Sequence, residues 1–426
     1  MVREMSPRER VLAAVEHKEP DRIPIHFGAP SSGIVEIVPP CHVTAGRNYG
    51  YTALVKYLGL YPPKPEPRMG SLNEVTNIDE RVLERLHSDT RCLYAGTAPR
   101  KYMPDGSFID RYGFRWYPLG PCYDVSGREP MRGVAKIEDM EKYPWPDPHD
   151  PIIGQGKEKE AKKLSEETEY WIIGVPELGQ SLLAIYFFLF GYERALTDPV
   201  LRPEFFKATM DRMMEVQKGI VETFLQATGD YIDVFYLGDD MGTQTGPTMS
   251  LDFYRKHWKR YHKELVQHSK KFTKAKIQLH SCGSNWIFVK DFREIGIDIL
   301  ENVQPKPWHN EPWRLKRDYG NIVCFFGGID VQELLPFGTI EDIEQVVKET
   351  IRIYGEDGGY ILALQHTAGA EIPPEKIVAV FDGAYEYGRY PLPKEAEIDR
   401  RTLEKYPYLS PELAVDSDAP VPTCNS

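Results

Sequence analysis

The sequence has little cysteine and no long apolar run. Its six cysteines are spread over 426 residues, which argues against a disulfide framework and fits a reducing compartment. No apolar stretch reaches the ~18 residues that a membrane helix needs. The N-terminal segment MVREMSPRER is charged from its third residue and lacks the apolar region of a signal peptide. These absences predict a cytoplasmic protein.

Positive charge and phosphate-binding glycine motifs are also scarce. The chain has 52 Lys and Arg against 64 Asp and Glu, a formal net charge of -12. A surface with this balance repels nucleic acid and anionic membranes, so neither is expected as a partner. Neither GxGxxG nor GxxxxGK[ST] follows the first predicted strand, which weighs against a dinucleotide-binding sheet.

The second half of the chain alternates short apolar strands with helices. Strands without polar alternation are typical of parallel strands that are buried on both faces. Eight strands are expected, at residues 23–27, near 90, near 172, and at 231–237, 276–280, 297–303, 322–326 and 360–364. We therefore predict an α/β fold, a (βα)8 TIM barrel, with an open doubly wound sheet as the alternative.

The barrel is predicted to form a single domain with elaborated N-terminal loops. It is expected to span residues 1–391, and the polar residues 392–426 are expected to form a C-terminal tail. Segment 28–170 is rich in Pro, Gly and Tyr and should supply loops over the mouth, with residues 110–116 as a hairpin or covering loop. At the start, Ser6 and Glu9 form a capping-box pattern that predicts a helix to about His17.

Polar residues gather where the predicted strands end. Active sites of βα barrels lie at the carboxyl ends of the strands. We expect substrate contacts from Gln244, Gln304 and Asp330, with a turn role as the alternative for Asp330, and catalysis from Asp239 or Asp240. Because Asp239 and Asp240 are adjacent, they face different ways, and the alternative is that one caps a turn while the other is solvated.

His280 and Cys282 are two residues apart at the end of one strand. Side chains at this spacing point the same way in extended backbone, so both can reach one ion. Thiolate with imidazole is a ligand set typical of zinc. His366, after the last strand, would complete a three-ligand site with an open fourth position, as in catalytic zinc. The alternative is a core thiol beside a hydrogen-bonded histidine.

Several motifs in order resemble the uroporphyrinogen decarboxylase-like superfamily over residues 6 to about 391. They are MSPRERVLAAVEHKEPDRIPI, GDDMGTQTGPTMS, LHSCGS, IGIDILENVQP, FFGGIDVQELLPFGT and GGYILALQHTAGAEIPPEKI. The resemblance implies a (βα)8 barrel. The superfamily has two main branches, the porphyrinogen decarboxylases and the cobamide-dependent, zinc-containing methyltransferases.

The resemblance is closer to the methyltransferase (O-demethylase) branch. A porphyrinogen decarboxylase would need an arginine-bearing segment after the first strand, but IPIHFG stands there and no arginine follows until Arg47. The methyltransferases carry HxC, matched by His280 and Cys282, and a third ligand, normally Cys, at whose place His366 stands. The methyltransferases often carry an acidic residue near the sixth strand, and its place falls here near Val303 and Gln304. The fourth ligand is therefore left open, with Glu301 as a candidate.

The resemblance implies a corrinoid-dependent methyltransferase that moves a methyl group between a small donor, such as a methoxylated aromatic, and a cobamide, with Zn²⁺ as Lewis acid. No corrinoid-binding segment is evident, so the cobamide is expected on a partner corrinoid protein or free. The resemblance also suggests a homodimer. Two other functions stay open: a metal-independent decarboxylase of a non-porphyrin carboxylate, and a non-catalytic barrel that binds a small molecule or a corrinoid.

Overall fold

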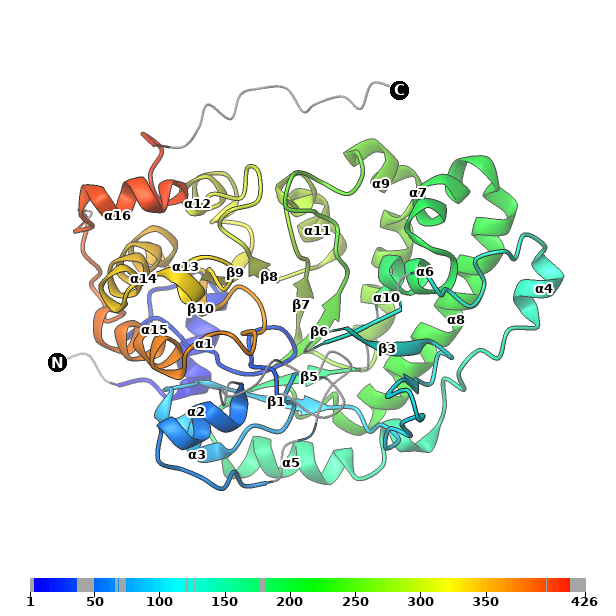
Figure 1. Cartoon of the computed structure of the whole chain (residues 1–426), viewed down its shortest axis with the longest axis horizontal. Coiled ribbons are helices and arrows are strands. Elements are labelled where there is room, and N and C mark those ends of the chain that lie inside the picture. The colour runs from blue at the N-terminus through cyan, green and yellow to red at the C-terminus, as the bar shows by residue number, and fades with distance from the viewer. Residues whose placement is uncertain are drawn as a thin grey trace.

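A computed structural model describes residues 4–36, 50–65, 68, 74–119, 122–125, 127–176, 181–395 and 397–413. Within them, seven parallel strands form one curled sheet in the order β1-β5-β6-β7-β8-β9-β10 (Figure 1). Their bounds are β1 Thr90–Tyr94, β5 Trp171–Val175, β6 Val234–Gly238, β7 Lys276–His280, β8 Ile299–Val303, β9 Cys324–Ile329 and β10 Tyr360–Leu364. The predicted α/β barrel class is confirmed, and β7 and β10 have the predicted bounds.

The eighth predicted strand, at 23–27, is present only as a single parallel bridge between Ile25 and Leu362 of β10. Pro24 has no backbone N–H to give to a ladder, and the N–H of Ile25 donates to the carboxylate of Asp89 at 2.8 Å. The carbonyl of Ile25 accepts from the N–H of Asp89, the residue before β1. The segment therefore lies between β10 and β1 but does not form a full strand.

A buried ion network holds this closure. The Asp89 carboxylate accepts from Arg10 at 2.7 Å and from two nitrogens of Arg22 at 2.8 Å. Arg10 also contacts Asp21, at 2.6 and 2.7 Å. Charged groups inside a protein are stable only when paired in this way, so the network ties the N-terminal segment to β1.

Helix α1 (Pro7–Val15) begins with the predicted capping box, in which Ser6 and Glu9 exchange side-chain and backbone hydrogen bonds. Its Val11 and Val15 belong to the cluster of apolar side chains that fills the barrel interior, together with Ile299 of β8 and Cys324 of β9. Apolar residues one turn apart lie on one face of a helix, so α1 covers one end of the barrel.

The other helices surround the sheet (Figure 1). Their bounds are α2 Tyr51–Tyr57, α3 Glu80–Arg85, α4 Ile137–Glu141, α5 Lys157–Glu167, α6 Leu182–Phe190, α7 Tyr192–Leu201, α8 Pro203–Thr228, α9 Leu251–His257, α10 Lys259–Ser269, α11 Val289–Ile295, α12 Pro312–Tyr319, α13 Leu334–Phe337, α14 Ile340–Gly355, α15 Pro374–Tyr387 and α16 Arg400–Lys405. Short 3-10 helices occupy Pro151–Ile153, Trp286–Phe288 and Pro407–Leu409. Within the described part of the chain, no helix combines the length and apolar character needed to cross a membrane.

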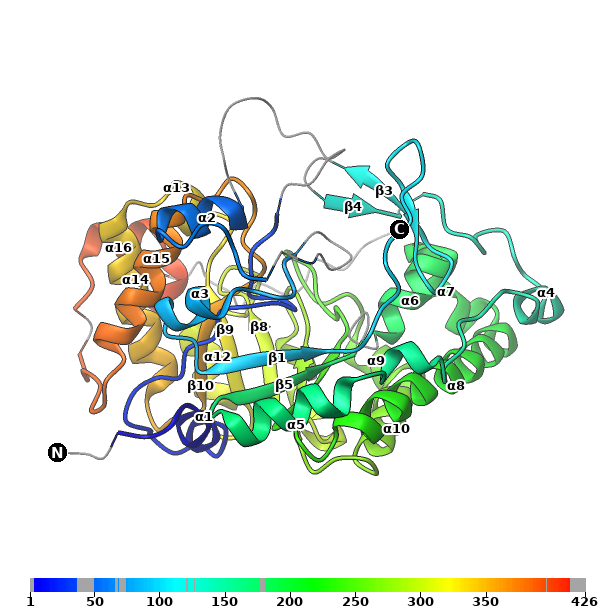
Figure 2. The same ribbon diagram turned by 90° about the horizontal axis from the view of Figure 1, so that it is seen from below.

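The N-terminal half contains more regular structure than we expected. A small antiparallel sheet, β2 (Phe108–Ile109), β3 (Arg115–Leu119) and β4 (Cys122–Asp124), stands apart from the barrel strands (Figure 2). It includes the predicted hairpin at 110–116. Helix α5, which the sequence analysis did not anticipate, buries only Ala161 along its length; so few apolar positions give a weak helical signal.

The predicted tail also differs from expectation as far as it is described. Helix α16 is anchored by Lys405, which contacts Asp342 of α14 at 2.5 Å. Tyr408 and Leu409 are buried. Residues up to 409 thus pack on the barrel, because two apolar side chains in this polar stretch reach the core.

Candidate metal centre at the barrel mouth

Three predicted ligands meet at the carboxyl ends of two strands. His280 ends β7, Cys282 follows it, and His366 follows β10. One ligand atom from each lies within 4.8 Å of the others, and no other such group of His, Cys, Asp and Glu is found among the residues described. Residues 86 positions apart are thus brought together by the barrel, as predicted from the shared rim.

The distance between two of the donors fits a tetrahedral metal site. The Cys282 Sγ atom lies 3.4 Å from Nε2 of His280. Zinc bond lengths of about 2.3 Å to sulfur and about 2.0–2.1 Å to nitrogen place two tetrahedral donors about 3.6 Å apart. The rings of His280 and His366 have centroids 6.1 Å apart. The three side chains could therefore hold Zn²⁺ after a small closure, with a fourth position left open.

Charge interactions within the cluster favour ionisation of the Cys282 thiol. Burial and the Asp240 carboxylate oppose ionisation of the thiol, but the neighbouring imidazoles of His280 and His366 hold the pKa of Cys282 below its usual range. Burial lowers the pKa of His366, but its hydrogen bond and charge interaction with Cys282 outweigh this and raise it. A thiolate shared between imidazoles is a site at which a metal ion can displace protons.

Neighbouring side chains fix the sulfur and the first imidazole. The amide of Asn302 donates to Cys282 Sγ at 3.1 Å. The Asp240 Oδ1 atom accepts from the backbone N–H of Cys282 at 2.8 Å and lies 3.4 Å from Nε2 of His280. Glu301 is on the opposite side of the ring, with Oε1 3.9 Å from Nδ1. Of the two, Asp240 and not Glu301 lies beside the donor atoms.

The two adjacent aspartates have different roles. Asp239 is buried and accepts from the backbone N–H groups of Leu182, Leu183 and Ala184 at 2.8–3.1 Å, which caps the N-terminus of α6. It also bonds Nε2 of His262 at 2.9 Å. Both oxygens of Asp239 thus hold structural contacts, and its predicted catalytic role stays a prediction. Asp240, with 53% of its side chain exposed, is the aspartate that faces the cluster.

The predicted substrate-binding residues also contribute to structure. Gln304 is buried, and its Oε1 atom accepts from the N–H of Gly283 at 3.0 Å and from Gln244 at 2.9 Å, which steadies the loop after Cys282. Asp330 accepts from the N–H of Gln332 at 2.7 Å and from Gln365 at 3.0 Å. Asp330 thus caps a turn and holds the residue before His366, whereas Gln244 is exposed at the mouth.

Asn302 was not predicted as a site residue, because nothing in the sequence Glu301-Asn302-Val303 marks one residue as facing the site.

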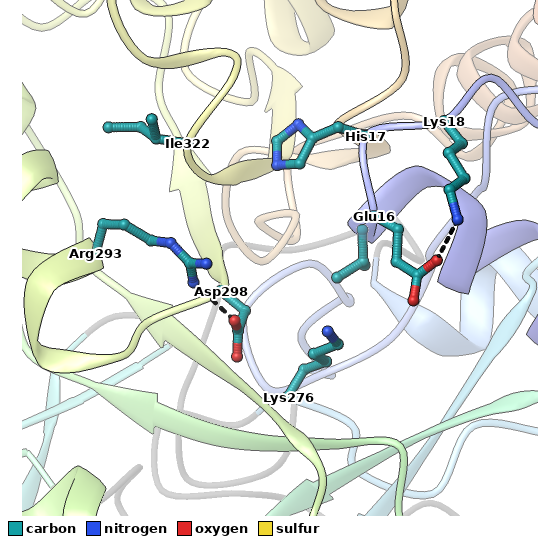
Figure 3. Close-up of a pocket in the computed structure, with 8 residues that line it drawn as sticks. Glu16, His17, Lys18, Lys276, Arg293, Asp298 and Ile322 are labelled. Carbon is teal, nitrogen blue, oxygen red and sulfur yellow. Dashed lines mark hydrogen bonds and ion pairs between the residues drawn. The ribbon is translucent and has the colours of Figure 1, made fainter.

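A cavity of about 360 Å³ elsewhere is not part of this centre. It is lined by His17, Lys18 and Lys276 among others (Figure 3). Lys276 is the first residue of β7 and His280 the last, so the cavity lies at the amino end of the barrel, about 13 Å away along the strand.

The comparisons with known proteins agree with this fold. The uroporphyrinogen decarboxylase (URO-D) family profile matches residues 180–387. A methyltransferase from Methanosarcina mazei superposes with a TM-score of 0.59 at 16% identity, covering 90% of this chain and 99% of its own. An alpha-amylase from Geobacillus thermoleovorans reaches only 0.34 at 11% identity, covering 77% and 68%. No curated protein matches the chain in sequence. Residues 180–387 are thus similar to the uroporphyrinogen decarboxylase family, and the structural likeness shows that the chain shares the fold of the methyltransferase.

Proposed function

We propose that the chain is a methyltransferase that moves a methyl group between a small donor, such as a methoxylated aromatic, and a cobamide. The observation that carries the proposal is the convergence of His280, Cys282 and His366 at the barrel mouth, with ligand atoms within 4.8 Å. The fold shared with a methyltransferase supports it. When bound to these residues, Zn²⁺ would supply a Lewis acid that lowers the cost of an anionic leaving group or acceptor thiolate.

The chain's own residues prepare this site. The imidazoles of His280 and His366 and the thiol of Cys282 supply soft and borderline donors, a set that selects zinc over magnesium or calcium. The half-exposed carboxylate of Asp240 stands beside Nε2 of His280 at 3.4 Å. Burial opposes its ionisation, but the His280 imidazole outweighs this and lowers the pKa of Asp240 to about 2, so the carboxylate stays ionised beside the donor atoms. The phenol of Tyr236, bonded to Ser31 at 2.9 Å, packs next to the His280 ring.

The cobamide is proposed to arrive on a corrinoid protein or free in solution. Activity should therefore require an added cobalt cofactor. Methyl transfer from a donor to an ordinary thiol by the purified chain, with no cobamide present, would contradict this part of the proposal.

Metal analysis of purified protein tests the centre. Wild type should contain about one zinc ion per chain, and Cys282→Ala should lose it while keeping the fold, since the interior packing and not the metal stabilises the barrel. Cys324→Ala is the matched control, because it removes a buried thiol from the same barrel, at the first residue of β9. Unchanged zinc in Cys282→Ala would refute the centre; partial retention in His366→Ala would not, because two ligands and water can still bind zinc weakly.

A spectral assay tests the reaction. Cob(I)alamin mixed with wild type and a panel of methoxylated aromatics should convert to methylcobalamin, and the Cys282→Ala variant should not support this conversion. A protein that binds zinc yet supports no methylation of cob(I)alamin by any donor, and no demethylation of methylcobalamin by thiols, would instead be a binding barrel.

A further inference from the structure

Strand β8 contains an irregularity one residue long beside the proposed centre. Glu301 pairs with Phe326 of β9, but the next pair is Val303 with Gly327, so Asn302 is an extra residue. Its φ angle is +73°, in the left-handed region that asparagine tolerates better than most residues. The surrounding structure must hold such a sparsely populated conformation in place.

The bulge redirects a side chain. In a regular strand Ile299, Glu301 and Val303 would share one face and residue 302 would point to the other. Bulges break this alternation and re-aim side chains, often next to active sites. Here Asn302 is fully buried, and its Nδ2 atom donates to the Cys282 sulfur at 3.1 Å. Opposite the bulge, Gly327 has a φ of +120°, and a Cβ there would lie 3.3 Å from the backbone N of Val303, so glycine suits this place in β9.

The Cys282 backbone is already fixed by other groups. Its own N–H donates to Asp240 at 2.8 Å, and the N–H of Gly283, a residue with φ of +74°, donates to Gln304 at 3.0 Å. With the backbone held, the direction of the sulfur depends on the side-chain torsion alone. The Asn302 amide acts on that remaining freedom.

We propose that Asn302 is a positioning residue for the metal centre: its N–H···S hydrogen bond directs the Cys282 sulfur toward the two imidazoles and sets how much charge the sulfur offers to a metal ion. This inference rests on the proposed function of the cluster. Hydrogen bonds to an ionised acceptor are strong, and partners of metal ligands typically change metal affinity 10–100-fold.

A purely structural role of Asn302 at the bulge would give a different experimental result. If only the left-handed backbone mattered, glycine would serve equally well, because it adopts positive φ without penalty. Asn302→Gly therefore separates the two roles: it keeps the backbone and removes the donor. Asn302→Asp keeps the shape and replaces the donor by an acceptor, and it serves if the glycine variant folds poorly. Asn285→Ala is the matched control, since Asn285 is another buried amide that donates nearby, to the carbonyl of Ser281 at 2.7 Å.

The experiment loads the full chain with Co²⁺ and records the sulfur-to-cobalt charge-transfer absorption, and it measures Zn²⁺ affinity by competition with a chromophoric chelator. Asn302→Gly or Asn302→Asp should lower zinc affinity about tenfold or more and move the absorption to lower energy, because the sulfur regains charge. Asn285→Ala should change neither. Wild-type affinity and absorption in both Asn302 variants would overturn the inference while leaving the metal centre intact.

If wild type takes up neither metal, the proposed function fails, and crystal structures of the metal-free protein decide the inference. An Nδ2–Sγ distance beyond about 4 Å in wild type, or an unchanged Cys282 rotamer in Asn302→Gly, would overturn it. A sulfur that swings away from the imidazoles in Asn302→Gly would support the positioning role.

Discussion

Replacing Asp239 by asparagine should destabilise the protein, whereas the same change at Asp240 should not. The Asp239 carboxylate accepts three backbone N–H groups at the start of α6 and contacts His262, and the side chain is 2% exposed. Oδ1 accepts one of these amides and Oδ2 accepts two. In either orientation, the NH₂ group of asparagine therefore faces at least one N–H donor.

The size of the effect follows from these contacts. A charge-assisted hydrogen bond contributes about 1.5–3 kcal/mol, and a buried donor left without a partner costs about 1–3 kcal/mol more. We expect a loss of about 3 kcal/mol in the free energy of unfolding. At about 2.1 cal/mol/K per residue, the 426 residues have an unfolding entropy near 0.9 kcal/mol/K, so the melting temperature should fall by about 3 °C.

Scanning calorimetry of wild type, Asp239→Asn and Asp240→Asn measures this directly. Asp240 has 53% of its side chain exposed, and surface substitutions usually stay within about 0.5 kcal/mol. Zinc content should be unchanged in Asp239→Asn, because its carboxylate faces α6 and not the donor atoms. A melting temperature of Asp239→Asn within about 1 °C of wild type, or a lower one for Asp240→Asn, would refute the assignment of the two aspartates.

Three more predictions follow from buried groups. Burial lowers the pKa of His26 from 6.5 to about 4, so between these pH values only the unfolded chain binds the proton. The neutral, buried His26 therefore contributes about 3 kcal/mol to the free energy of unfolding. This contribution is complete above pH 6.5 and is lost as the pH falls toward 4. Urea titrations should show this loss in wild type and a flatter profile in His26→Gln; equal slopes would contradict the assignment. Gly283→Ala should lose zinc, because the new Cβ would lie 2.4 Å from the carbonyl carbon of Gly242 at a φ of +74°; full zinc occupancy would show that the loop can move aside. Asp89→Ala should cost about 3–5 kcal/mol by leaving Arg10 and Arg22 without their shared buried partner, and a loss below about 1 kcal/mol in urea unfolding would count against the closure network.

The strands of the second half could be predicted because their signal is local. Residues 276–280 and 360–364 are short apolar runs bounded by polar or glycine residues, and both are strands with these bounds. The segment at 23–27 gave the same signal, but Pro24 and the distant Asp89 divert its backbone hydrogen bonds. A pattern of apolar residues does not reveal a partner 64 positions away.

The sequence by itself determined the barrel and the pairing of His280 with Cys282, because alternation along an extended chain places residues two apart on one side. It also placed His366 on the same rim, since parallel strands of a barrel end together. Only the tertiary structure decided which aspartate faces the cluster, because that choice depends on the N-terminus of α6, 55–57 positions before Asp239. Only the tertiary structure showed that Asn302 reaches the sulfur. A bulge in β8, opposite Gly327 in β9, turns the Asn302 side chain away from the face to which regular alternation would direct it.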